Sequence, residues 1–326
     1  MKDNEKENGV LAERNYYKPF NYPWAYEAYK KQQQMHWMPE EVPLQDDIKD
    51  YKEKLTPANR RLVDNIFRFF TQADVDVCCG YAKHYLPTFK QPEIRMMLVS
   101  FASMEAVHQD AYSLLLETLG KEDDIYKEFM DIQEMVEKHE YLSDFNMDTK
   151  HDIAKTMAVY SGFTEGVQLF SSFAILLNYP RHNLMKGMGQ IVTWSIRDET
   201  LHVESVSRLF RTFLAENPEI WNDKLKFEIY CAAERVVELE DKFIDICFDK
   251  ADIPDLTAKE VKEYIRYIAD RRLLGLGMKN IFHSSENPLP WIDMQVNAVE
   301  HTNFFENRAT EYAKSSTKGN WQDIFK

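Results

Sequence analysis

The sequence predicts an all-α protein built as a bundle of long helices, and three observations support this prediction. Apolar residues recur at spacings of three and four through most of the chain, as they do on one face of an α-helix. Only 10 glycines and 12 prolines interrupt the 326 residues, and most of the prolines fall within 19–43, 87–92 and 288–290. No alternating strand-like run bounded by Asn-Gly or Asp-Gly turns is present.

The elements follow in order along the chain. Residues 1–40, rich in tyrosine, tryptophan and proline, predict an N-terminal extension that wraps the bundle as extended chain and short helix. The helical domain spans 41–300, and the same apolar periodicity predicts its helices at 57–84, 91–119, 124–140, 150–178, 185–215, 219–248 and 257–281. Residues 301–326 are polar with isolated aromatics, which predicts a flexible tail for docking to a partner.

Composition narrows the classes of partner and compartment. With 40 Lys and Arg against 54 Asp and Glu, the net charge is −14, which repels phosphate backbones and anionic membrane surfaces. We therefore expect neither nucleic acid nor membrane as a partner. The four cysteines form no Cys-x-x-Cys pair, and neither a signal peptide nor a membrane-spanning run is legible, so we expect a soluble protein of the reducing cytoplasm.

A helix with a lone carboxylate followed by a helix with Glu-x-x-His occurs twice. The residues of the two copies are, in order, Asp74, Glu105, His108, Glu165, Glu199 and His202. Residues three apart on a helix project in nearly the same direction, so each Glu and His pair can bind one ion. Chance alone gives on the order of one Glu-x-x-His in such a chain, and a lone histidine is more often a core residue, but two matched copies favour a metal site.

Four carboxylates and two imidazoles in a bundle core suit a pair of iron or manganese ions better than zinc. Without cations, four buried carboxylates would be very costly or would take up protons, whereas two divalent ions cancel their charge. One carboxylate from each of two helices and Glu-x-x-His from two others is the arrangement of ferritin-like dinuclear proteins, with Asp74 here in place of one Glu.

Separated motifs in a fixed order carry a resemblance to a known family. HWMPEEVPLQDD, FFTQADVDV, SFASMEAVHQDAYSLLLE, SGFTEGVQLFSSF and RDETLH together resemble the small, radical-generating subunit of class I ribonucleotide reductase, from about Trp37 to the tail. The resemblance implies that the six residues of the two copies bind the metal pair. It also implies a homodimer and a large catalytic subunit that reduces ribonucleotides to deoxyribonucleotides with the oxidant it receives.

The resemblance assigns further residues to this chemistry. Tyr112, one turn beyond His108, matches the radical-bearing tyrosine, although some relatives have phenylalanine there and store the oxidising equivalent on a manganese and iron pair. Asp198, which points away from the face of Glu199, and Trp37 match a relay that leads outward from a ligating histidine. Without the resemblance, a surface salt bridge with Arg197 explains Asp198, and packing explains Trp37. An apolar pocket is expected around Tyr112. Its candidate walls are Phe101, Leu169 and Phe173, and plain core packing explains all three equally well.

In the tail, Glu306 precedes Tyr312 by six residues, which matches the family's spacing of a glutamate and an interfacial redox tyrosine. Trp321, Ile324 and Phe325 provide apolar anchors for a partner groove, but the terminal lysine departs from the acidic ends of the family.

The sequence leaves several alternatives open. Di-iron is the first expectation for the cofactor, with manganese and iron or two manganese ions as alternatives, since all share these ligand types. Activation by oxygen, or by superoxide from an activating flavoprotein, stays undecided. A ferritin-like oxidase acting on a small or fatty ligand, and an iron-storage protein, are the alternative functions. Neither needs an electron path outward or a long tail.

Overall fold

The computed structural model describes residues 9–122, 126, 133–141, 146–251 and 253–296. Every regular element among these residues is a helix, which confirms the prediction of an all-α protein. The chain divides into two compact units, Met1–Leu289 and Pro290–Lys326. The helical bundle lies in the first unit, and the described part of the second, residues 290–296, is one helical stretch. None of the described helices combines the length and apolar character that a membrane span needs.

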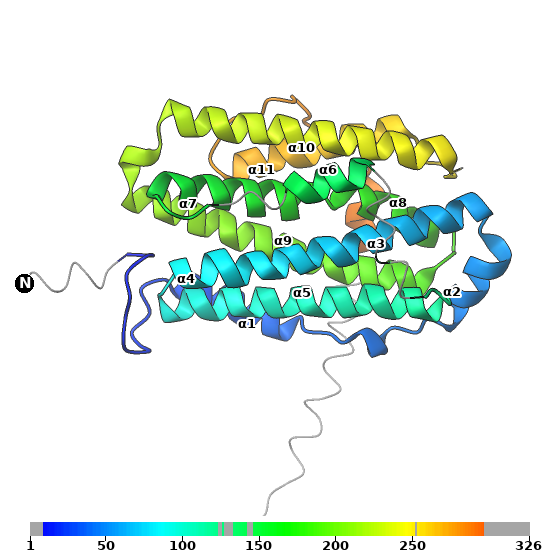
Figure 1. The fold of residues 1–326 in the computed structure, drawn as a ribbon, viewed down its shortest axis with the longest axis horizontal. Coiled ribbons are helices and arrows are strands. Elements are labelled where there is room, and N and C mark those ends of the chain that lie inside the picture. The colour runs from blue at the N-terminus through cyan, green and yellow to red at the C-terminus, as the bar shows by residue number, and fades with distance from the viewer. Residues whose placement is uncertain (1–8, 123–125, 127–132, 142–145, 252, 297–326) are drawn as a thin grey trace, which may run out of the picture. The chain divides into compact units, whose positions relative to one another are not determined.

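The most extensive packing between two of the described helices joins α3 (Pro57–Gly80) to α5 (Pro92–Thr118), which lie side by side in Figure 1. Both helices begin with proline, whose fixed backbone angle suits the first helical position. Thr56 also caps α3, because its hydroxyl accepts the backbone N–H of Asn59 at 3.2 Å. Beyond α3 the helix continues as a π-helical turn, Tyr81–Tyr85 (η3), and a short helix, Leu86–Thr88 (α4), close to the predicted end at residue 84.

The helix α9 (Lys186–Glu216) packs against α5 and begins at a fixed position. The buried Asp47 accepts hydrogen bonds from the backbone N–H groups of Gly187 at 2.9 Å and Met188 at 2.8 Å. A Cβ atom on Gly187 would lie 2.7 Å from the carbonyl oxygen of Pro43, so this close approach requires glycine. The start of α9 is thereby anchored, and with it the register of the polar residues further along the helix.

The predicted regular helix at 150–178 is wrong in its detail. The structure has α7 (Lys150–Thr156), a nine-residue π-helix, Met157–Glu165 (η6), a turn, and then α8 (Phe170–Arg181). A π-helix has a wider backbone helix than an α-helix, and such segments are frequent at functional sites. Here it ends at Glu165, so the wider spiral sets the direction of that carboxylate.

Close packing holds η6 against α3. The hydroxyl of Tyr160 donates to the carbonyl of Val77 in α3 at 2.6 Å. This is possible only because residue 80 is glycine, since a Cβ there would lie 2.0 Å from the Tyr160 hydroxyl oxygen. The pairing brings Glu165 and Asp74, which are carried by these two segments, into the same core.

The remaining helices cover this core. They are α1 (Pro23–Gln34), η1 (Pro39–Glu41), α2 (Gln45–Lys49), η2 (Asp50–Lys54), α6 (Gln133–Tyr141), η7 (Pro218–Ile220), α10 (Asp223–Lys250) and α11 (Ala258–Gly275). The helix α1 packs against α5 and α9, and α10 packs against η6 and α11. The helix α11 ends before the predicted residue 281, because Gly277 takes a left-handed backbone angle of 82° that stops it.

A buried lysine fixes the turn that follows η6. Lys138 of α6 is fully buried, and its Nζ lies 2.6 Å from Oε1 of Glu240 in α10. The same Nζ donates to the carbonyl of Gln168 at 2.9 Å, and its charge lies over the rings of Phe69 and Phe243. A buried charge is stable only when paired and hydrogen-bonded, and Lys138 meets both conditions.

Candidate metal centre

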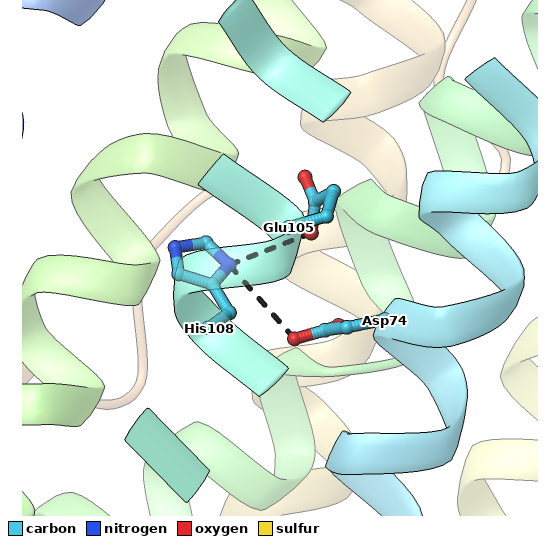
Figure 2. A group of neighbouring side chains, drawn as sticks. All are labelled: Asp74, Glu105 and His108. Atoms are coloured by element: carbon cyan, nitrogen blue, oxygen red, sulfur yellow. Dashed lines mark ion pairs between the residues drawn. The ribbon is translucent and has the colours of Figure 1, made fainter. Parts of the chain in front are cut away.

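The six residues of the two sequence copies come from four segments of the bundle. Asp74 lies on α3, Glu105 and His108 on α5, Glu165 at the end of η6, and Glu199 and His202 on α9. None has a relative exposure above 1%. Figure 2 shows three of them, with one ring nitrogen of His108 facing an oxygen of Glu105 and an oxygen of Asp74.

Two three-residue groups share one glutamate. Asp74, Glu105 and His108 form the first group, and Glu105, Glu199 and His202 form the second; within each, one donor atom per residue lies within 4.8 Å of the others. Glu105 places Oε2 at 3.4 Å from Nδ1 of His108 and Oε1 at 2.9 Å from Nδ1 of His202. The carboxylate of Glu105 therefore lies between the two imidazoles.

Glu199 also faces both imidazoles. Its Oε1 lies 3.4 Å from Nδ1 of His108, and its Oε2 lies 3.8 Å from Nδ1 of His202. Asp74 faces only one of them, with Oδ2 at 3.9 Å from Nδ1 of His108. Glu165 belongs to neither group, but the charges of Glu199 and Glu105 act on it, so it is a neighbour of the cluster.

Whether this cluster fits metal ions can be judged from its buried oxygen and nitrogen atoms that have no hydrogen-bond partner. They are both carboxylate oxygens of Asp74 and Oε2 of Glu199, while the oxygens of Glu105 face only Nδ1 of the two imidazoles. Buried polar atoms are normally hydrogen-bonded, and leaving this many unpaired in one place is very unfavourable. Carboxylate oxygens and imidazole nitrogens are ligands for iron and manganese, so the donor set fits a pair of such ions.

Repulsion among the carboxylates changes their proton affinity. Burial, together with the charge of Glu105, raises the pKa of Asp74 well above its usual range. Burial and the charges of Glu199 and Glu105 raise the pKa of Glu165 in the same way. Burial and Glu105 also raise the pKa of Glu199. These three carboxyl groups therefore bind protons where a free carboxyl group is ionised.

The carboxylates around His108 outweigh the effect of burial on its pKa. Burial alone would lower the pKa of His108, but the carboxylates of Asp198 and Glu105 around the ring raise it well above its usual value. Burial would raise the pKa of Asp198, yet its contact with His108 lowers it, so Asp198 stays ionised. Metal ions must displace the protons held by His108 and by the carboxyl groups.

We expect the affinity for divalent metal to rise with pH. A carboxyl group or histidine with a raised pKa in the folded state stabilises the metal-free fold fully below its unfolded pKa, and this contribution is lost as pH rises. From ~pH 5.5 to ~7.5 the metal-free protein should therefore lose thermal stability, and metal should restore it. Each proton released per ion increases the apparent affinity about tenfold per pH unit. Melting temperatures with and without Mn²⁺ across this range measure the effect, and an affinity that is flat or falls with pH would contradict it.

The outer nitrogen of each imidazole has its own partner. Nε2 of His108 lies 3.3 Å from Oδ2 of Asp198, and Nε2 of His202 lies 3.1 Å from Oε1 of Gln32 in α1. The amide of Gln32 also donates to Oδ1 of Asp198 at 3.2 Å. With Nε2–H donating outward, Nδ1 of each ring is free to bind a metal ion. Gln32 was not identified from the sequence, because its place beside α9 is set by tertiary packing alone.

Trp37 lies on the outer side of the same carboxylate. Its Nε1–H donates to Oδ2 of Asp198 at 2.8 Å, and its ring stacks on His108 with centroids 6.0 Å apart. Asp198 is fully buried, and Arg197 contributes a further contact of 3.4 Å to its Oδ1. His108, Asp198 and Trp37 therefore form a continuous hydrogen-bonded series that begins at the cluster.

Tyr112 lies beside His108 in an apolar pocket. It is 1% exposed, and its ring centroid lies 6.2 Å from that of His108. The rings of Phe67 and Phe70 of α3 pack on the ring of Tyr112, with centroids 5.5 and 5.2 Å away. Of the walls suggested by the sequence, Phe173 contacts Phe70, whereas Phe101 packs on the ring of His202 at 4.3 Å. Tyr112 and His108 therefore lie together on one face of α5.

The tail residues Glu306 and Tyr312, and the anchors Trp321, Ile324 and Phe325, lie outside the described residues. Their roles remain predictions.

Comparisons of the sequence and of the fold relate this chain to known proteins. A sequence model of the family described as "Ribonucleotide reductase, small chain" matches residues 14–288. The Invertebrate iridescent virus 6 protein named "Probable ribonucleoside-diphosphate reductase small subunit 376L" is 47% identical over 354 residues, covering 97% of this chain and 98% of that protein.

Solved structures share the fold. The ribonucleotide reductase R2 subunit from Clostridium botulinum has a TM-score of 0.79 at 23% identity and covers 85% of this chain and 89% of its own. The dimanganese(II)-NrdF of Streptococcus sanguinis has a TM-score of 0.74 at 23% identity and covers 86% of this chain and 99% of its own. These likenesses confirm the predicted ferritin-like bundle. The chain therefore belongs to the family of ribonucleotide reductase small chains.

Proposed function

We propose that this chain assembles a dinuclear metal cofactor, uses it to oxidise Tyr112, and passes the oxidising equivalent to a large catalytic subunit that reduces ribonucleotides to deoxyribonucleotides. One observation carries the proposal: the buried carboxylates without hydrogen-bond partners surround two imidazoles, one of which continues through Asp198 to Trp37. A ligand-binding oxidase or an iron-storage protein has no use for such a series.

The metal ions would be held by the six residues of the two sequence copies. Glu105 and Glu199, which face both imidazoles, would contribute carboxylate oxygens to the metal pair. When bound, a pair of redox-active ions supplies electrons to dioxygen or superoxide and can then oxidise a nearby phenol. Iron is the first expectation and manganese the alternative, and superoxide would require an activating flavoprotein as a further partner.

Tyr112 would store the oxidising equivalent. Its loss of one electron and one proton gives a neutral phenoxyl radical, which persists only where water and reductants are excluded. The side chain is 1% exposed and lies against Phe67 and Phe70, which keep the phenol in apolar surroundings. Burial also raises the pKa of Tyr112 well above its usual value, so the resting phenol keeps its proton.

Asp198 and Trp37 would carry the equivalent outward. Asp198 holds Nε2–H of His108 and Nε1–H of Trp37 on the same oxygen, Oδ2, at 3.3 and 2.8 Å. Glu306 and Tyr312 in the tail would continue this relay to the large subunit. The chain would act as a homodimer in the cytoplasm, with residues 1–40 as an extension on the bundle 41–300 and residues 301–326 as the docking tail.

Trp37→Phe tests the outward relay. The ring stack on His108 is preserved, but the N–H that donates to Asp198 is lost, so radical formation should survive while electron transfer to the partner fails. We expect nucleotide reduction with the large subunit to fall at least about 100-fold, or roughly 3 kcal/mol in the barrier. The measurement combines a nucleotide reduction assay with metal analysis and electron paramagnetic resonance.

Trp221→Phe is the matched control, because Trp221 packs on Phe210 and Lys226 and has no contact with Asp198. It should keep full turnover. Wild-type turnover in Trp37→Phe would exclude Trp37 from the relay.

A further inference from the structure

Two buried tyrosines lie beside the cluster, each next to a different imidazole. Tyr112 lies 6.2 Å from His108 between ring centroids, and Tyr81 lies 6.4 Å from His202. Both are 1% exposed or less, and both contact other aromatic rings. Distance to the nearer imidazole and burial therefore do not distinguish the two phenols as sites for oxidation.

Hydrogen bonding does distinguish them. The hydroxyl of Tyr112 donates to Oγ of Ser195 at 2.9 Å. The hydroxyl of Tyr81 instead faces the carboxyl group of Glu165, one of the proposed ligands, and has no serine partner like Ser195. Ser195 is fully buried in α9, four residues before Glu199, and its own hydroxyl donates to the carbonyl of Ile191 at 3.0 Å.

A phenoxyl oxygen can only accept a hydrogen bond, so the contact between Tyr112 and Ser195 must reverse when the phenol is oxidised. A hydroxyl group rotates to suit its partners and has a single hydrogen to give. The carbonyl of Ile191 already accepts the backbone N–H of Ser195 within the helix, so it stays satisfied when the side-chain hydrogen turns away.

We propose that Ser195 is a positioning residue for the oxidised state of Tyr112: its hydroxyl accepts from the phenol at rest and turns from Ile191 to donate to the phenoxyl oxygen. This inference rests on the proposed function, in which Tyr112 loses one electron to the loaded metal pair and one proton to the carboxylate cluster. The donated hydrogen bond stabilises the radical and marks Tyr112, rather than Tyr81, as its site.

Deuterium exchange tests the proposal in the unmodified protein. After exchange into D₂O, electron-nuclear double resonance of the tyrosyl radical should show an exchangeable deuteron coupled to the unpaired electron. This deuteron is the one in the hydrogen bond from Ser195 to the phenoxyl oxygen. In Ser195→Ala that coupling should disappear, the high-field g₁ value should rise, and the radical half-life should shorten about fivefold, as expected for one lost hydrogen bond. Ser195→Thr keeps the hydroxyl and should retain the coupling.

Thr193→Val is the matched control, because Thr193 makes the same bond to the carbonyl four residues earlier, at Gly189, on another face of α9. It should leave the coupling unchanged. A second readout needs no metal. In fluorotyrosine-labelled protein, the ¹⁹F resonance that is missing from Tyr112→Phe should shift in Ser195→Ala and stay in place in Thr193→Val.

The outcomes separate this inference from the function on which it rests. A tyrosyl radical without an exchangeable deuteron, or with the same coupling in Ser195→Ala, would overturn the role of Ser195 and leave the proposed function standing. Absence of any tyrosyl radical in the loaded wild type would overturn both.

Discussion

Tyr112→Phe is expected to abolish the stable radical and all nucleotide reduction while the chain still binds two metal ions. The substitution removes only the phenolic oxygen, so no O–H group is left to lose an electron and a proton at this position. The ring itself remains in the pocket formed by Phe67 and Phe70, and packing should change little. Because Tyr112 is not one of the proposed ligands, metal content should be unaffected.

The measurement is electron paramagnetic resonance after aerobic loading with ferrous iron, together with metal analysis and an assay with the large subunit. Tyr85→Phe is a matched control, since it also removes a fully buried phenolic oxygen that contacts a serine, Ser161, at 3.2 Å. It should keep the wild-type signal. A signal that persists in Tyr112→Phe would place the radical on another residue, and turnover without any tyrosyl signal would show that the metals store the oxidising equivalent.

The sequence predicted the parts of the site that depend on helix periodicity. Glu105, His108 and Tyr112 are three and seven residues apart, and one helix face holds them wherever the helix lies in the bundle. The repeat of the same spacing at Glu199 and His202 then identified the opposite face. Local rules of this kind are independent of tertiary packing, so a single sequence is sufficient for them.

The contacts between different helices were harder to predict from the sequence. Gln32 reaches Asp198 and His202 only because α1 packs against α9, and nothing in its local sequence distinguishes it from its neighbours Gln33 and Gln34. Ser195 carried a detectable signal, since it is a polar residue in a run of apolar ones, on nearly the same face as Glu199. That run predicted a helix correctly, but only the structure pairs the serine with Tyr112.

The π-helix at Met157–Glu165 shows a second limit. Its residues are all buried, so the apolar pattern is nearly continuous and cannot distinguish a regular helix from a wider one. The residue spacing that predicts the shared faces of α5 and α9 is that of a regular α-helix. It therefore gives the wrong direction for Glu165. This residue is also the one proposed ligand that belongs to neither three-residue group, so its role depends most on direct measurement of metal binding.

Glu199→Gln should have opposite effects on the metal-free and the metal-loaded protein. In the metal-free state, burial and the charge of Glu105 raise the pKa of Glu199. Ionisation of this carboxyl group therefore destabilises the metal-free fold as pH rises. A neutral amide of the same size relieves that repulsion, and near pH 7.5 the metal-free variant should melt at a higher temperature than the metal-free wild type. With metal, the same change removes an anionic ligand that faces both imidazoles.

Loss of an outer partner of a metal ligand costs about 10- to 100-fold in affinity, so loss of a direct ligand should cost at least about 100-fold. A ligand present at about 100 times its dissociation constant stabilises a fold by about 2.7 kcal/mol, and Glu199→Gln should lose most of that gain. Glu204→Gln, an exposed position on the same helix, controls for the change in net charge. Two ions bound with wild-type affinity in Glu199→Gln would exclude Glu199 as a required ligand, whereas a destabilised metal-free variant would show that its carboxylate supports the fold without metal.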